Sequence, residues 1–141
     1  MSSFDPFLHG EITEFPQGIH FGQDRIAPNF SSVNSQAADA IAGRSIAEVA
    51  SDLRKGLISP DLFVISYTKD PLSGKFVTLN NRGLAALAEG GKRPQYAVFV
   101  PYEKLPSYLV SDIKSRASSL SINITEIKNG SGVLRTVNNC M

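Results

Sequence analysis

Apolar residues recur with a helical period between residues 45 and 56, where four of them follow the spacing i, i+3, i+4 and i+7. This spacing places all four on one face of a helix. Ser45 with Glu48 fits a capping box, in which each side chain bonds an N–H group of the first turn, and Gly56 supplies a stop. The pattern therefore predicts an amphipathic helix over residues 45–55.

Shorter runs that are rich in β-branched and aromatic residues predict strands. These runs lie at 19–21, 62–67, 75–79, 96–100, 122–127 and 133–137. Turn-forming residues at 70–74 and at 129–132 separate neighbouring runs, so we expect a hairpin around each of these two turns.

Helices are predicted in three further segments, at 35–42, from about 81 to 90, and from 106 to about 120. Tyr108, Leu109 and Ile113 are expected on the inner side of the last helix. The order of elements predicts an α+β fold, with a small mixed sheet and flanking helices, rather than a doubly wound fold. Residues 1–18 lack periodicity and are expected to be an extended leader or linker remnant, and 19–141 are expected to form the domain.

The composition sets few limits beyond those of an ordinary domain. The chain has 141 residues, and 14 Lys and Arg against 13 Asp and Glu give a formal charge of +1. This balance does not indicate a broadly basic nucleic-acid-binding surface, although a neutral total can hide a basic face. One cysteine, Cys140, allows no disulfide within the chain, and no Cys/His cluster has metal-ligand spacing. With no disulfide framework, a reducing cytoplasm is the simplest compartment, so we expect a cytoplasmic site of action. We expect no membrane partner, because no apolar run approaches the length of a membrane span.

Candidate chemistry is clearest at Asn80, Asn81 and Arg82, between a predicted strand and a predicted helix. A helix that begins here directs free N–H groups and the positive end of its dipole toward the preceding segment. Arg82 in the first turn opposes that dipole, and its forked cation suits phosphate. The three residues therefore predict a phosphate-binding corner. The structural alternative is an Asn cap followed by a solvated Arg.

A second cluster contains His20, Gln23, Asp24 and Arg25. His20 can act as a general base and Asp24 can orient it or take part in proton transfer. Asp24 also offers one carboxylate to a divalent metal, although no second carboxylate stands near it in the sequence. An ordinary polar loop is the structural alternative.

Arg44 precedes the predicted helix start at Ser45. It is a candidate for stabilising negative charge in a reaction, and the alternative is an exposed loop arginine. The chain contains no P-loop, no G-x-S-x-G, no H-E-x-x-H and no dinucleotide fingerprint.

These residues, taken in order, carry a resemblance to a known family. The matching segments are Ile19-His20-Phe21-Gly22-Gln23-Asp24-Arg25-Ile26, Phe30-Ser31, Gly43-Arg44-Ser45-Ile46, Thr78-Leu79-Asn80-Asn81-Arg82-Gly83-Leu84-Ala85-Ala86-Leu87, and the final hairpin with Thr125-Glu126-Ile127 and Asn129-Gly130-Ser131-Gly132. Over roughly residues 19–137 the chain resembles the ParB/sulfiredoxin superfamily. More narrowly, it resembles the ParB-like C-terminal domains of bacterial polymorphic toxins.

The resemblance implies that the corner at Asn81 and Arg82 binds a nucleotide or DNA phosphate, and that Gln23 and Arg25 accompany it. Sulfiredoxin chemistry is disfavoured, because it needs a cysteine at this corner. The chain departs from the toxin-like pattern at three positions: Gly83 replaces a second Arg, Asn80 replaces Asp, and His20 replaces Arg. One Arg fewer predicts weaker phosphate binding unless Arg44 or Arg25 compensates.

Three functions follow as hypotheses. The first is a toxin or effector nuclease, with His20, Asp24 and Arg44 as catalytic residues and the Asn80–Arg82 corner, with Gln23 and Arg25, holding phosphate. Such a domain is secreted or delivered as part of a larger toxin, and the resemblance implies a cognate immunity protein as partner. The second is a nucleotide-binding or nucleotide-hydrolysing module without nuclease activity. The third is a non-catalytic DNA-binding domain.

Overall fold

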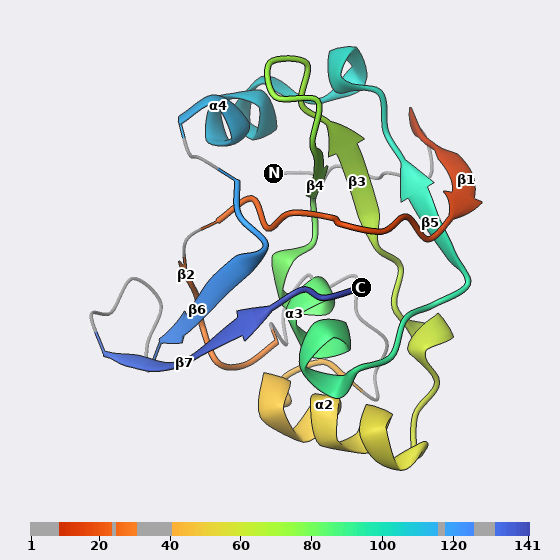
Figure 1. Ribbon diagram of the computed structural model, residues 1–141, viewed down its shortest axis with the longest axis vertical. Helices are drawn as coiled ribbons and strands as arrows, with labels where there is room; N and C mark the ends of the chain where they lie inside the picture. Colours follow the sequence, from red (N-terminus) through yellow and green to blue (C-terminus); the bar gives the residue numbers. More distant parts are fainter. Residues whose placement is uncertain (1–8, 24, 31–40, 116–117, 126–131) are drawn as a thin grey trace.

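A computed structural model describes residues 9–23, 25–30, 41–115, 118–125 and 132–141 of the chain (Figure 1). Most of the helix expected at 35–42 and nearly all of the loop expected at 129–132 lie outside these residues, and so does Asp24. The described part is a mixed α+β fold with three α-helices and two small mixed sheets.

The larger sheet has four strands in the order β1-β5-β3-β4. They are β1 (Glu11–Glu14), β5 (Tyr96–Phe99), β3 (Ser66–Lys69) and β4 (Phe76–Thr78). The β1–β5 and β3–β4 pairs are antiparallel, whereas β3 and β5 are parallel. The hairpin expected around residues 70–74 is confirmed, because β3 and β4 flank that turn. The first of its strands begins later than predicted, since Pro60–Leu62 form a short 3₁₀ helix, η1.

The smaller sheet has three strands in the order β2-β6-β7. They are β2 (Arg25–Ile26), β6 (Ser121–Thr125) and β7 (Val133–Asn138). β2 runs parallel to β6, and β7 is antiparallel to β6, as the predicted final hairpin requires. The mixed character of the sheet is therefore confirmed, but the strands are divided between two sheets instead of one.

The segment expected as a strand at 19–21 links the two sheets instead of joining one of them. His20 forms an isolated parallel bridge with Val77 of β4. Phe21 forms an antiparallel bridge with Ser119, just before β6. Ile19 and Phe21 are completely buried, so this segment crosses the core between the sheets.

The helix expected at 45–55 is confirmed as α2 (Ile46–Lys55). Ser45 Oγ accepts the N–H of Glu48 at 3.1 Å, and Gly56 ends the helix in the left-handed conformation with φ of 73°. The four apolar residues of the predicted face are all buried, as their spacing predicts.

Two more helices follow, α3 (Asn81–Gly90) and α4 (Ser107–Ser115). α3 has the predicted bounds and is closed by Gly91 with φ of 67°. α4 is shorter than predicted, because Ser119 forms a β-bridge with Phe21 and the Leu120 carbonyl accepts the N–H of Asn139. The prediction that Tyr108 lies on the inner side of α4 is wrong: its side chain is 53% exposed, while Leu109 and Ile113 pack inward.

Residues 11–15, expected within an extended leader, pack with the rest of the molecule. β1 pairs along its full length with β5, and Phe15 is buried in the main core. The Phe15 N–H also bonds the Gln95 carbonyl at 3.1 Å. The packed unit therefore begins before residue 19. The sequence did not reveal this strand because Glu11–Glu14 contains a single apolar residue, Ile12, and the structure leaves that residue exposed.

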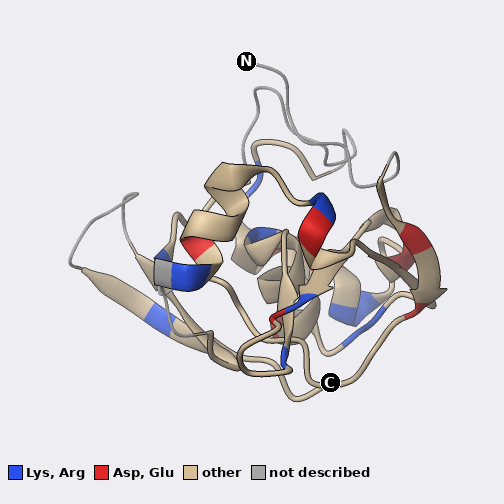
Figure 2. Cartoon of the chain, turned by 90° about the horizontal axis from the view of Figure 1, so that it is seen from above, with Lys and Arg blue, Asp and Glu red and all other residues tan. Residues whose placement is uncertain are grey.

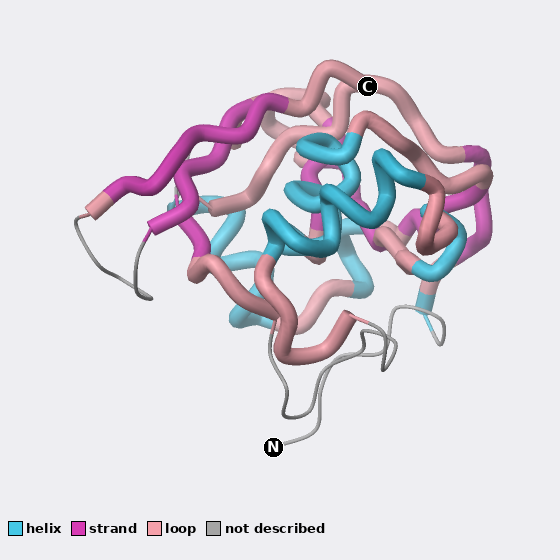
Figure 3. Tube along the Cα trace, turned by 90° about the horizontal axis from the view of Figure 1, so that it is seen from below, coloured by secondary structure: helices cyan, strands magenta, loops and turns pink. Residues whose placement is uncertain are grey.

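The main core lies where α2 and α3 pack against both sheets, and Figure 3 shows these helices between the β6–β7 hairpin and the β1–β5 pair. Gly90 lets α2 and α3 approach closely, because a Cβ at that position would lie 2.9 Å from Leu53 Cβ. A second, smaller cluster joins α4 to Val98, Val100 and Leu105. Within the described residues, no helix combines the length and the apolar character that a bilayer span requires.

Candidate functional site

The predicted phosphate-binding corner is the N-terminus of α3. Asn80 is the N-cap, and its Oδ1 accepts the N–H of Gly83 at 3.0 Å. Thr78 Oγ1 in turn accepts the N–H of Asn80 at 3.0 Å, which fixes the cap residue at the end of β4. Among the described residues nothing caps the N–H groups of Asn81 and Arg82. Two first-turn donors therefore remain for another acceptor.

Arg82 lies in this first turn with a half-buried side chain. No residue in the described part of the chain forms a hydrogen bond or an ion pair with its guanidinium group. The first turn of α3 also contains no acidic residue. An uncompensated cation beside two free N–H donors is a favourable environment for an anion.

The His20 segment lies along the same corner. The His20 N–H bonds the Phe76 carbonyl at 2.8 Å, and the Thr78 N–H bonds the His20 carbonyl at 2.9 Å. Gly22 then donates its N–H to Asn81 Oδ1 at 2.8 Å. The structure therefore brings the backbone of the His20 segment to the end of β4 and to Asn81, some 60 residues further along the sequence.

The ring of His20 is half-buried and oriented by its own segment. Its Nδ1 lies 2.9 Å from the Gly18 carbonyl oxygen, which can only accept, so Nδ1 carries the proton. The neutral ring then has an unprotonated Nε2, the form that a general base requires. Gly18 has φ of 74°, a conformation that directs its carbonyl here at no steric cost because it has no side chain.

The side-chain oxygen of Asn81 is used within the protein, and its predicted phosphate contact stays a prediction. Asn80 already caps the helix, so the Asn81 carbonyl oxygen is free to accept from Gly22. Only the amide NH₂ group of Asn81 is left for a ligand. Gly22 also lies close to β4, because a Cβ on Gly22 would be 3.1 Å from Val77 Cγ1 and 3.4 Å from the Thr78 carbonyl.

Arg44 belongs to the start of α2. Its guanidinium forms an ion pair with Asp52 at 2.8 Å and lies 3.8 Å from Glu48. The charge of Arg44 is thus paired with carboxylates of its own helix, and its predicted catalytic role stays a prediction.

The remaining predicted residues follow the His20 segment. Gln23 is exposed, and Arg25 is exposed at the start of β2. Asp24, between them, lies outside the described residues. The roles predicted for these three residues stay predictions.

Gly83 occupies the place where the toxin-like pattern has a second Arg, and the Asn80 cap explains why a glycine fits there. A Cβ at Gly83 would lie 2.7 Å from Asn80 Nδ2 and 3.0 Å from Asn80 Oδ1. The Asn80 side chain thus fills the space that a larger residue at 83 would need. The two departures from the pattern are coupled through this contact.

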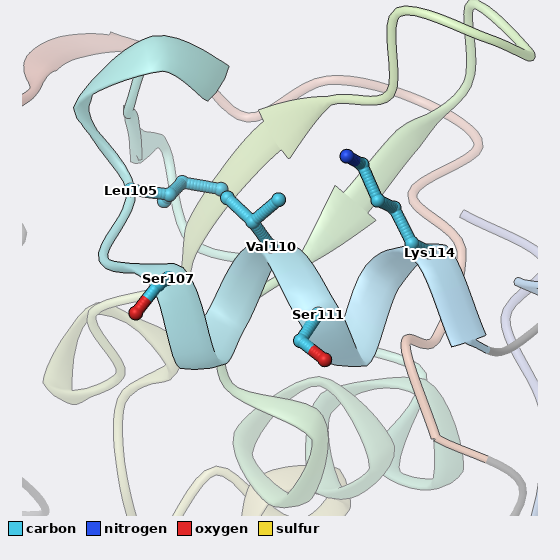
Figure 4. Close-up of a pocket in the computed structure, with 5 residues that line it drawn as sticks. All are labelled: Leu105, Ser107, Val110, Ser111 and Lys114. Carbon is cyan, nitrogen blue, oxygen red and sulfur yellow. The ribbon is translucent and has the colours of Figure 1, made fainter.

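The surface around the site is not broadly basic. Figure 2 shows Lys and Arg of the described residues scattered over the elements and interspersed with Asp and Glu. The described residues also contain no group of three His, Cys, Asp or Glu that could hold a metal ion. A groove of about 610 Å³ along α4 is lined by none of the predicted site residues (Figure 4); its walls are Leu105, Ser107, Val110, Ser111 and Lys114.

Comparisons with protein-family models, with curated proteins and with solved structures find no match to this chain. The candidate site therefore depends on the geometry of its own residues.

Sequence analysis missed three residues that organise the site: Gly18, Gly22 and Thr78. The two glycines flank the His20 segment, and their spacing was a usable sign that the backbone turns or approaches another element closely there. Thr78 gave no such sign, because a threonine at the end of a strand is common.

Proposed function

We propose that this chain is a phosphodiesterase domain that acts on nucleic acid, in the toxin or effector class that its resemblance to ParB-like domains implies. The observation that carries the proposal is the uncompensated, half-buried Arg82 at the start of α3, with the His20 segment bonded alongside it. The oxygens of a phosphate at this position would accept hydrogen bonds from the backbone N–H groups of Asn81 and Arg82 and from the Arg82 guanidinium.

The chemistry assigned to these groups is hydrolysis of a phosphodiester. His20 Nε2 removes a proton from the attacking water, whose oxygen bonds to phosphorus, and the bond from phosphorus to the leaving oxygen breaks. Arg82 and the two N–H groups stabilise the negative charge that accumulates on the phosphoryl oxygens. The leaving oxygen takes its proton from His20 or from solvent.

The test compares the wild type with Arg82→Ala and His20→Ala on plasmid DNA and on labelled DNA and RNA oligonucleotides, with a panel of divalent cations. Arg93→Ala is the matched control, because Arg93 is an exposed arginine just beyond the other end of α3. We expect both site variants to lose about 100-fold or more in cleavage rate, and the control to retain it. A wild type that is inert on DNA and RNA with every common divalent cation contradicts the proposal.

Calorimetric titration with nucleoside triphosphates separates the proposal from its alternatives. Binding of free nucleotide without any effect on polymers would favour a nucleotide-binding or nucleotide-hydrolysing module. Binding of DNA that falls steeply with salt, without cleavage, would favour a DNA-binding domain. The scattered charge in Figure 2 supports neither a broad nor a strongly salt-dependent contact.

A further inference from the structure

The inference concerns how His20 is kept at the start of α3. Three of the hydrogen bonds of its segment join it to β4 and the start of α3, and two of these connect backbone to backbone, from His20 to Phe76 and Thr78 of β4. The third joins the Gly22 N–H to the side chain of Asn81, at 2.8 Å. It is the only one of the three that depends on the identity of a side chain.

This third bond fixes the far end of the segment. Beyond Gly22 the chain turns away to β2, and Gln23 is already exposed. Phe21, between His20 and Gly22, is buried and exchanges two backbone hydrogen bonds with Ser119, so it is anchored away from the corner. Among the described residues, the bond to Asn81 is the only hydrogen bond of the Gly22 N–H. Loss of the bond therefore releases Gly22 from the corner, two residues after His20.

Helix stability does not require Asn81. Asn80 supplies the cap through Gly83, so the first turn forms without the Asn81 side chain. Asn81 lies half-buried, and its Oδ1 is directed to a residue 59 positions away. An asparagine that neither caps its helix nor presents its carbonyl to solvent connects two separate parts of the site.

We propose that Asn81 is a positioning residue, whose carbonyl holds Gly22 and thereby keeps His20 at the N-terminus of α3. The effect of Asn81 on catalysis rests on the proposed function, whereas its role in holding Gly22 does not. The proposal replaces a direct phosphate contact of the Asn81 side chain with an action through His20, and it leaves the Asn81 backbone N–H as a phosphate donor.

Two substitutions separate positioning from phosphate contact. Asn81→Ala removes the acceptor for Gly22, whereas Asn81→Asp keeps an acceptor oxygen but puts a negative charge beside Arg82. We expect Asn81→Ala to lower kcat by about 10- to 100-fold with little change in KM. We expect Asn81→Asp to raise KM and to retain most of kcat.

Hydrogen exchange of the Gly22 amide, followed by NMR, supplies a readout that needs no activity. Exchange should accelerate by about tenfold in Asn81→Ala and stay close to wild type in Asn81→Asp. Unchanged Gly22 exchange in Asn81→Ala overturns the proposal, and so does an effect of that variant on KM alone. If the exchange result is as expected but the wild type cleaves nothing, the positioning role stands and only the proposed function fails. Should Asn81→Ala not fold, Asn81→Asp still tests the bond, because accelerated Gly22 exchange or a large loss of kcat in this variant, which keeps the acceptor oxygen, overturns the proposal.

Discussion

The starts of α2 and α3 are built from the same parts and differ in how their arginines are used. Each helix has a polar side chain as N-cap, Ser45 in one and Asn80 in the other, and each has an arginine within two residues of that cap. In α2, Glu48 and Asp52 lie on the arginine's side and pair with Arg44. The first turn of α3 contains no acidic residue, and Arg82 has no partner in the described part of the chain.

This difference shows that an arginine near a helix start is not by itself a sign of anion binding. The dipole disfavours a cation there in both cases, and a carboxylate one or two turns later removes the conflict. Where no carboxylate is provided, the conflict remains until an anion binds. The acids that follow the arginine therefore decide whether it serves stability or binding.

The largest expected effect separates the two arginines by affinity for a phosphate-bearing ligand. Arg82→Ala should weaken binding of a nucleotide or short oligonucleotide by about 10- to 100-fold, because charge-assisted hydrogen bonds contribute about 1.5–3 kcal/mol. Arg44→Ala should leave the affinity unchanged within about twofold. Fluorescence anisotropy measures both. Equal losses in the two variants would mean that the two helix starts form one site.

The second effect is on stability, and here Arg44→Ala should have the larger effect of the two variants. Arg44→Ala should lower the free energy of unfolding by about 1 kcal/mol, because it leaves the partly buried Asp52 without its cation. Arg82→Ala should leave stability unchanged or raise it slightly, since it removes a cation from the wrong end of the dipole. Urea denaturation followed by circular dichroism checks both. A destabilised Arg82→Ala would indicate that Arg82 is structural.

The smallest effect tests the coupling between Asn80 and Gly83. Alanine for glycine inside a helix normally stabilises by about 1 kcal/mol, but here the new Cβ displaces the cap, whose loss costs about as much. Gly83→Ala should therefore change stability by less than about 0.5 kcal/mol in the wild type. In an Asn80→Ala background, the same change should stabilise by about 1 kcal/mol. Additive values in this double-mutant cycle would show that the cap does not occupy the space beside Gly83.

Much of the fold could be predicted because local rules specify it. The caps and stops of α2 and α3 are encoded within a few residues of each helix end, and the β3–β4 turn is encoded in the same way. The division into two sheets could not be predicted, because it depends on contacts between distant segments such as His20 with Val77. Tyr108 was misplaced since its helical spacing also fits a neighbouring face, and only packing decides between them.

The candidate site follows the same rule. The Asn80 cap and the position of Arg82 could be predicted, because they follow from one strand-to-helix junction. The pairing of each arginine could not be predicted, because Arg44 forms its ion pair with Asp52 only once the helix has formed. The role of Asn81 could not be predicted either, because its partner, Gly22, is 59 residues away.

The central claim is that the start of α3 binds a phosphate, and titration of the isotope-labelled protein with inorganic phosphate, followed by backbone amide NMR, tests it most directly. The account predicts saturable shifts of the Asn81 and Arg82 amides, absent in Arg82→Ala, with the amides at the start of α2 unaffected. Amides at the start of α3 that do not move, or that move no more than those of Ser45 and Ile46, would contradict it.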